Sequence, residues 1–208
     1  MPSSDSHPRV TLPRALEGLY KGEVPWFVVP AGGVPSMGLA GVSAPILCPV
    51  YSGSFRPLHA AHRAIHRQVM RMRGSCCFEV SIRNFEKGLH DPLEMQRVIE
   101  QFEGWATVWV TAAMTFSEKA GMLPPSPTFV CGADVFMRVI EHPEKPDALF
   151  LVFNRAIVSG EPGVPEWMPL SERIGSREVG VRFQEVPFMR MDVSSSMVRR
   201  DFNDAGRR

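Results

Sequence analysis

The stretch Gly53-Ser54-Phe55-Arg56-Pro57-Leu58-His59-Ala60-Ala61-His62 decides how the chain folds. An apolar run, Pro45–Tyr51, precedes it and is typical of a buried strand. After it, apolar residues recur at helical spacing from Ile65 to Met72. The pattern therefore predicts a strand over residues 46–50, a tight Gly-Ser turn, and a helix that begins near Pro57, because proline suits the first turn of a helix. The free N–H groups and the dipole at such a helix start favour an anion.

Two histidines lie at this predicted helix start. His59 and His62 are three residues apart, so their side chains share one edge of the first turn. Two imidazoles beside a set of backbone donors suit a polyphosphate and the charged transition state of its transfer. We interpret the other histidines differently: His66 packs or faces solvent, and His7, His90 and His142 lie on the surface.

From residue 45 onward, strand-like runs alternate with helix-like segments. Asp91 followed by Pro92 predicts a helix start, Gly104 predicts a stop, and apolar positions after Gly132 predict a further helix. The alternation predicts an α/β fold with a doubly wound, mainly parallel sheet of five to six strands and helices on both faces. Ligands of such sheets bind at the carboxyl ends of the strands, where the strand order switches. The predicted strands are Ile46–Val50, Cys77–Ser81, Val108–Thr111, Thr128–Cys131, Leu149–Phe153 and Val181–Val186.

Residues 1–44 are expected to form an irregular lead-in. Their Gly-rich part, residues 30–43, has neither a following Gly-Lys-Ser/Thr nor dinucleotide-binding spacing, so it is not a phosphate loop. Within the lead-in, Arg14–Tyr20 predicts a short helix and Trp26–Val29 a brief strand.

Bulk composition excludes several classes of function. The formal net charge of +1 over 208 residues gives no reason to expect a nucleic-acid partner. The four cysteines have no zinc-binding spacing and are interpreted as reduced core residues. No apolar run has membrane-spanning length, and the N-terminus lacks a secretory pattern. We therefore expect no membrane partner and a cytoplasmic protein, or also a nuclear one if the source is eukaryotic.

Four segments, in order along the chain, carry a resemblance to a known family. The stretch 53–62 resembles the G-x-F-x-P-x-H-x-G-H loop of the HxGH nucleotidyltransferases, and Val193–Arg199 resembles their I-S-S-T-x-I-R motif. Phe129–Asp134 is similar to the G-x-D segment of the nicotinamide mononucleotide adenylyltransferase branch, and Phe78–Lys87 to the F-E-x-S-x-x-N-x-D-K stretch of its cytidylyltransferase-like subgroup. Two positions depart from the family pattern: Ala61 replaces the usual Gly, and Arg56 the usual Asn or Asp.

The resemblance implies a Rossmann-like nucleotidyltransferase domain over residues 45–208 and assigns roles within it. His59 and His62 are the implied catalytic residues. Asp134 is the implied ribose ligand or else a helix cap, and Arg199 with the preceding serines is the implied β/γ-phosphate site or else a capped terminal helix. The full set of implied nucleotide- and substrate-binding residues is Gly53, Ser54, Phe55, Arg56, Lys87, Asp134, Arg155, Ser194, Ser195, Ser196 and Arg199.

The implied reaction joins ATP to nicotinamide mononucleotide (NMN) or nicotinate mononucleotide, giving NAD or its acid analogue and pyrophosphate. The alternatives are a cytidylyltransferase, an adenylyltransferase with a different phosphorylated acceptor, or a nucleotide-binding module that has lost catalysis. Mg²⁺ is expected to arrive with ATP, without a metal site made by the protein. A homo-oligomer is left open.

Overall fold

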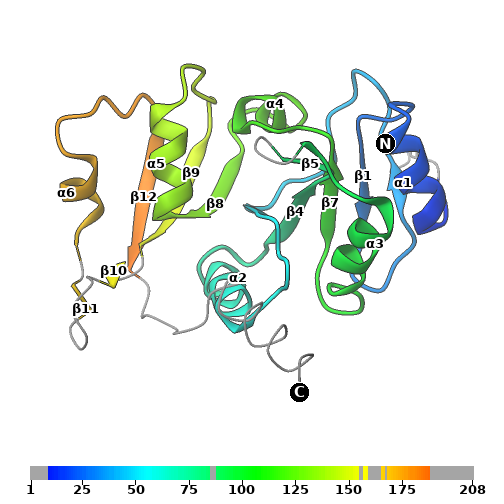
Figure 1. Cartoon of the computed structure of the whole chain (residues 1–208), viewed down its shortest axis with the longest axis horizontal. Coiled ribbons are helices and arrows are strands. Elements are labelled where there is room, and N and C mark those ends of the chain that lie inside the picture. The colour runs from blue at the N-terminus through cyan, green and yellow to red at the C-terminus, as the bar shows by residue number, and fades with distance from the viewer. Residues whose placement is uncertain (1–8, 85–87, 155–156, 159–164, 167, 188–208) are drawn as a thin grey trace.

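Six parallel strands form the centre of the protein (Figure 1). The computed structural model describes residues 9–84, 88–154, 157–158, 165–166 and 168–187. Across these ranges the main sheet has the order β12-β9-β8-β3-β4-β7-β1-β2. Its strands are β1 (Trp26–Val29), β2 (Ser36–Met37), β3 (Val50–Ser52), β4 (Cys77–Ser81), β7 (Val108–Thr111), β8 (Thr128–Gly132), β9 (Leu149–Asn154) and β12 (Arg182–Pro187).

The parallel strands have the order of a doubly wound sheet. Counted along the chain from β3, the six run 3-2-1-4-5-6 across the sheet. The order reverses between β3 and β8, which pair directly through Val50–Phe129 and Tyr51–Val130. This neighbourhood is the switch point at which such sheets bind ligands. The predicted α/β, mainly parallel fold class is confirmed.

Helices cover both faces of the sheet, as predicted (Figure 1). Successive residues of a strand point to opposite faces, so Tyr51 joins one core cluster and Val50 the other. The first cluster takes apolar residues from α1, α2 and α3, and the second from α5, α6 and the end of α4. The helices are α1 (Leu12–Tyr20), α2 (Ala60–Arg73), α3 (Pro92–Glu100), α4 (Phe116–Gly121), α5 (Ala133–Glu141) and α6 (Leu170–Ile174).

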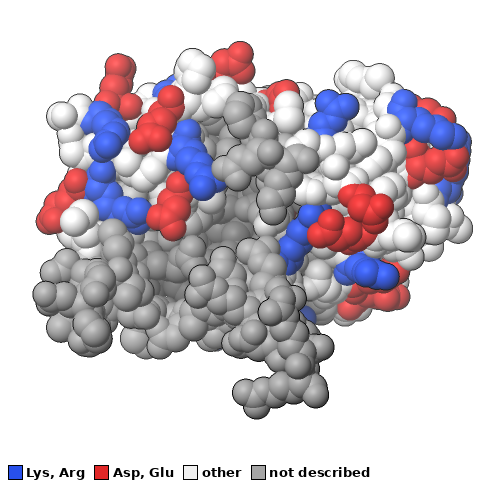
Figure 2. All heavy atoms as spheres, in the orientation of Figure 1, with Lys and Arg blue, Asp and Glu red and all other residues white. Residues whose placement is uncertain are grey.

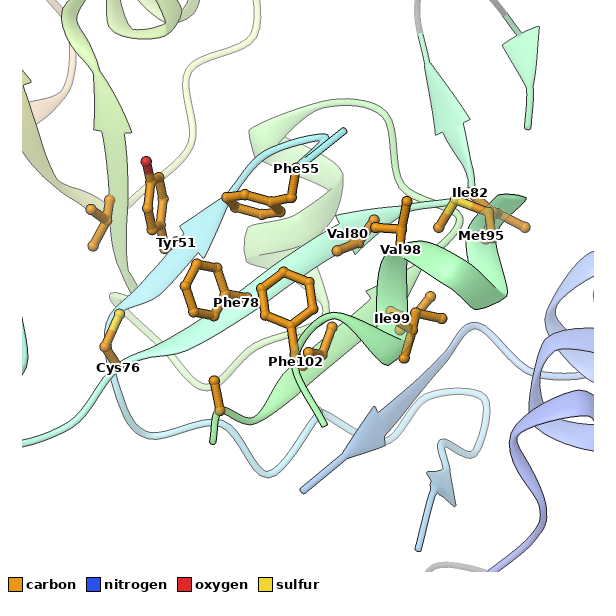
Figure 3. Close-up of a cluster of buried hydrophobic side chains, with 14 of the residues drawn as sticks. Tyr51, Phe55, Cys76, Phe78, Val80, Ile82, Met95, Val98, Ile99 and Phe102 are labelled. Carbon is orange, nitrogen blue, oxygen red and sulfur yellow. The ribbon is translucent and has the colours of Figure 1, made fainter. Parts of the chain in front are cut away.

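Aromatic rings fill the first core cluster next to the turn at residues 53–56 (Figure 3). Phe78 of β4 lies 4.6 Å from Phe102 and 5.0 Å from Phe55, measured between ring centroids. His66 of α2 stacks on Phe78 at 4.9 Å, which agrees with its interpretation as a packing residue. Burial lowers the pKa of His66, because the charged imidazolium loses its hydration there.

The sheet is wider than predicted, because the described part of the expected lead-in belongs to it. Eight strands replace the predicted five to six. The extra two are β1, which pairs antiparallel with β7, and β2, which pairs antiparallel with β1. The strand predicted at Trp26–Val29 has those bounds, and the helix predicted from Arg14 begins at Leu12. The division of the chain at residue 45 itself stays a prediction.

Two predicted boundaries around the key stretch were wrong. The strand predicted over 46–50 begins only at Val50, because Pro45 and Pro49 have no N–H for a ladder, and Leu47 is 90% exposed. The helix predicted near Pro57 begins at Ala60, with His59 as its N-cap.

Two short strand pairs lie outside the main sheet: β5 (Arg83–Asn84) with β6 (Gly88–Leu89), and β10 (Ile157–Val158) with β11 (Pro165–Glu166). Figure 2 shows basic and acidic side chains interspersed on the described part of one face, in keeping with the small net charge. Within the described ranges, none of the helices combines the length and apolarity needed to cross a bilayer.

Candidate functional site

The turn after β3 is built around the ring of Phe55. The Gly53 N–H donates to the backbone oxygen of Glu79 at 3.1 Å, which ties the turn to β4. Phe55 has φ of 47°, a left-handed conformation that is unusual for a bulky residue. Its ring folds back over Gly53, so that a Cβ on Gly53 would lie 2.8 Å from the Phe55 Cζ. Glycine is therefore required at position 53.

Phe55 itself is a core residue. Its ring is buried and contacts Tyr51, Phe78 and Phe102 edge-on, at centroid distances of 5.2, 5.0 and 5.6 Å (Figure 3). Because the ring is buried in the core, only the backbone of Phe55 is left to make the predicted contact with a substrate. The side chain shapes the turn.

The two motif histidines meet at the start of α2. The His59 N–H donates to Nδ1 of His62 at 3.3 Å, and the two rings stack with centroids 3.6 Å apart. Because Nδ1 of His62 accepts this bond, the proton of its neutral ring is on Nε2. His59 is 8% exposed, whereas His62 is half-buried and also packs edge-on against Phe55. The prediction that they share one edge of the first turn is confirmed; their catalytic role stays a prediction.

A cavity of about 440 Å³ opens at the carboxyl ends of β3 and β4. It lies at the switch point, because one wall follows β3 and another is α5, which follows β8. Gly53, Ser54 and Arg56 of the predicted site line it, whereas neither His59 nor His62 is among its lining residues. The other lining residues are Ser52, Ser81, Arg83, His90, Met114, Thr115, Phe116, Ser117, Lys119, Val135, Arg138, Val139, His142, Glu144 and Pro146.

The cavity wall is strongly basic. Among the described residues that line it, Arg56, Arg83, Lys119 and Arg138 are formal cations and Glu144 is the one carboxylate, although Arg56 and Lys119 also pair with Glu94 and Glu79 outside the lining. Methionine and phenylalanine side chains, Met114 and Phe116, supply an apolar part. Such a lining suits an anionic ligand that also carries a flat or apolar portion.

Arg56 is held firmly at this wall. Its Nη1 donates to Nδ1 of His90 at 2.9 Å and forms an ion pair with Oε1 of Glu94 at 3.0 Å. Because Arg56 always carries protons, His90 accepts through an unprotonated Nδ1. The interpretation of His90 as a surface residue without context was wrong: it lines the cavity and orients Arg56. His142, interpreted likewise, also lines the cavity.

Asp134 lies in the first turn of α5 and is not among the described residues that line the cavity. Its carboxylate is 68% exposed and pairs with Arg173 of α6 at 2.7 Å. The neighbouring Val135 and Arg138 of α5 do line the cavity. The prediction that Asp134 binds ribose therefore stays a prediction, and in this structure its partner is an arginine.

Sequence reasoning missed most of the basic wall. Arg83, Lys119 and Arg138 follow the ends of β4, β7 and β8 respectively. These three residues are far apart in the sequence and share no motif. The available signal was the rule that ligands bind at the carboxyl ends of parallel strands. The remaining predicted residues, Lys87, Arg155, Ser194, Ser195, Ser196 and Arg199, lie outside the described residues.

Metal ligands are sparse around the cavity. Within the part of the chain that the structure describes, no group of three or more His, Cys, Asp or Glu is placed to hold a metal ion.

The solved structures that are similar to this chain include two of one protein. No protein-family model matches the chain, and no curated protein matches its sequence. A structure of Plasmodium falciparum nicotinic acid mononucleotide adenylyltransferase complexed with APC is similar to 74% of this chain and 82% of that chain, at 14% identity and a TM-score of 0.47. A second structure, of the same protein complexed with NaAD, covers 77% and 88% at 15% identity and a TM-score of 0.46. Likenesses of this size carry no argument about the reaction.

Proposed function

We propose that the protein is a nucleotidyltransferase, an adenylyltransferase that joins ATP to NMN or nicotinate mononucleotide and releases pyrophosphate. One observation carries the proposal. The turn 53–56, whose sequence resembles the nucleotidyltransferase loop, borders a basic cavity at the switch point of a 3-2-1-4-5-6 sheet. The sequence motif, the strand order and the basic lining thus all indicate the same edge of the sheet as the binding site.

The reaction needs positioning and charge stabilisation. A phosphate oxygen of the mononucleotide attacks the α-phosphorus of ATP, the bond to the bridging oxygen breaks, and pyrophosphate leaves with that oxygen. No covalent intermediate with the protein is required. What the protein must supply is alignment of two anionic substrates and stabilisation of the charge that develops on the transferred and leaving phosphates.

The basic wall suits this requirement. Arg56 is oriented by His90 and Glu94, so its guanidinium is preorganised before substrate arrives. Neither motif histidine is among the described residues that line the cavity, and the sequence resemblance alone supports His62, whose ring proton is on Nε2, as the donor to a phosphate oxygen. His59, which stacks on it, is assigned to holding that ring in position.

Mg²⁺ is assigned to the triphosphate. Bound there, it would neutralise charge and favour pyrophosphate departure. The one carboxylate among the described lining residues, Glu144, agrees with a metal held mainly by the substrate.

An acceptor panel tests the proposal. Purified protein is incubated with Mg²⁺ and either ATP or CTP, together with NMN, nicotinate mononucleotide or an unrelated phosphomonoester, and pyrophosphate release is followed. Turnover with ATP and either pyridine mononucleotide supports the proposal. Turnover with CTP, or with the unrelated acceptor alone, identifies a different nucleotidyltransferase. Nucleotide binding without release in any combination identifies a module without catalysis.

A further inference from the structure

A buried lysine forms part of the cavity wall. Lys119 of α4 has a side chain that is 8% exposed, yet it is one of the residues that line the cavity. Its Nζ pairs with Oε2 of Glu79 at 2.8 Å and donates to Oγ of Ser52 at 2.9 Å. It also lies 5.2 Å from the centre of the Phe116 ring. Few lysines are buried to this degree unless they are paired.

The partners of Lys119 come from three neighbouring strands. Ser52 and Thr111 end β3 and β7, Glu79 is the middle residue of β4, and all three lie on the face of the sheet that α4 covers. Thr111 Oγ1 donates to Oε1 of Glu79 at 2.9 Å, and Ser52 Oγ donates to Oε2. Both carboxylate oxygens are therefore engaged, which fixes the carboxylate and the ammonium that it holds.

The same glutamate also holds the turn of the candidate site. Its backbone oxygen accepts from Gly53 N–H, and its side chain bonds Ser52, the residue immediately before. The position of Lys119 relative to the turn is thus set by one residue of β4. A merely structural ion pair would gain little here, because a buried pair is seldom more stabilising than apolar residues of the same size.

An ammonium has three N–H donors, and among the described residues two oxygens, of Ser52 and Glu79, accept from Lys119. We propose that Lys119 is a substrate-binding residue that directs its third N–H into the cavity and donates it to an anionic phosphate oxygen. The inference rests on the proposed function and adds a residue to that site. An ammonium suits this place, since it is a compact point charge, and its poorly hydrated surroundings strengthen the bond.

The test uses a double variant, because removing Lys119 alone leaves Glu79 buried without its cation. Glu79→Gln/Lys119→Met removes both charges and preserves approximate shape. Lys145→Met serves as the matched control: the Lys145 ammonium is also partly buried, but it bonds backbone oxygens after α5, including that of Val139 at 3.3 Å, and does not line the cavity. Binding of inorganic tripolyphosphate is measured by calorimetry, and unfolding by circular dichroism.

We expect the double variant to fold cooperatively and to bind tripolyphosphate about 10- to 100-fold more weakly than the wild type, the range for a lost hydrogen bond to a charged group. The control should lose stability without losing affinity. Equal affinity in wild type and double variant overturns the proposal, as does a wild type that does not bind tripolyphosphate. Lys119→Arg should recover part of the affinity, because it restores the charge with a less suitable shape.

Steady-state kinetics show whether Lys119 contacts the nucleotide or the acceptor, and they test the role of Lys119 separately from the proposed function. If the wild type turns over, a rise in KM for ATP in the double variant places the contact on the nucleotide, and a rise for the acceptor places it there; unchanged kcat and KM overturn the inference. If the wild type turns over no substrate pair, the proposed function fails, while weaker tripolyphosphate binding still supports a phosphate contact at Lys119.

Discussion

Replacing Gly53 by alanine tests the geometry of the functional turn most directly. The added Cβ would lie 2.8 Å from Cζ of Phe55 and 3.1 Å from the next ring atom. Separations below about 3.0 Å are not tolerated, so either the ring or the turn must move. The ring has little room, because Tyr51, Phe78 and Phe102 surround it.

The magnitude follows from the packing. Inserting a methyl into a well-packed core costs about 1–3 kcal/mol. For a protein of this size, each kcal/mol lowers Tm by about 2–4 °C, so we expect Gly53→Ala to lower Tm by about 2–12 °C. Because the turn carries Ser54 and Arg56 to the cavity wall, turnover should fall as well.

A double-mutant cycle isolates the contact. Phe55→Leu shortens the side chain that obstructs the new methyl, and the double variant Gly53→Ala/Phe55→Leu should be more stable than the sum of the two single effects predicts, by about 1 kcal/mol or more. Urea unfolding of the four proteins measures this coupling. Additive effects within about 0.5 kcal/mol, or an unchanged Tm for Gly53→Ala, would refute the packing argument.

Three further outcomes are expected. His62→Ala should lose about 100-fold or more of turnover while still unfolding cooperatively, since a preorganised donor is removed; near-normal turnover would remove the motif histidine from the mechanism. Burial lowers the pKa of His66 below 6.5, so its neutral form stabilises the fold above pH 6.5, and this contribution is lost as the pH falls through the lower pKa of the folded state. Between about pH 6.5 and 5, His66→Leu should therefore lose less stability than the wild type in parallel urea titrations. Equal losses in the two proteins would contradict this. A chelator should stop nucleotidyl transfer, and Mg²⁺ should restore it, with Tm unchanged throughout; unfolding on chelation would indicate instead that the protein itself holds a structural metal.

The strands were predictable where apolar residues dominate a short run of the chain. Cys77–Ser81 and Val108–Thr111 have the predicted bounds, because each crosses the buried centre of the sheet. The strand before the turn was predicted too early, since hydrophobicity alone ignores the missing N–H groups of Pro45 and Pro49. The helix after the turn starts three residues later than Pro57 suggested, because His59 adopts the extended backbone of an N-cap.

The candidate site was predictable only where its residues are adjacent in sequence. The turn 53–56 and the contact between His59 and His62 follow from local spacing. The bond between Arg56 and His90 spans 34 residues, and that between Lys119 and Ser52 spans 67. Such pairs depend on strand order and register, which local periodicity does not encode.

The antiparallel hairpin at the start of the chain has a further consequence. Without this hairpin, β7 would be an edge strand of the sheet, with a row of unpaired backbone N–H and C=O groups facing water. Exposed borders of this kind pair with other chains and lead to aggregation. Here β1 occupies that border through four residue pairs, and the outermost strand, β2, has only two residues. Gly38 helps to hold this hairpin together, because its N–H donates to the backbone oxygen of Trp26 at 2.8 Å. A Cβ at position 38 would overlap the indole of Trp26. The segment ahead of the turn 53–56 thus leaves a strand of two residues at this edge of the sheet, which limits edge-to-edge pairing with other chains.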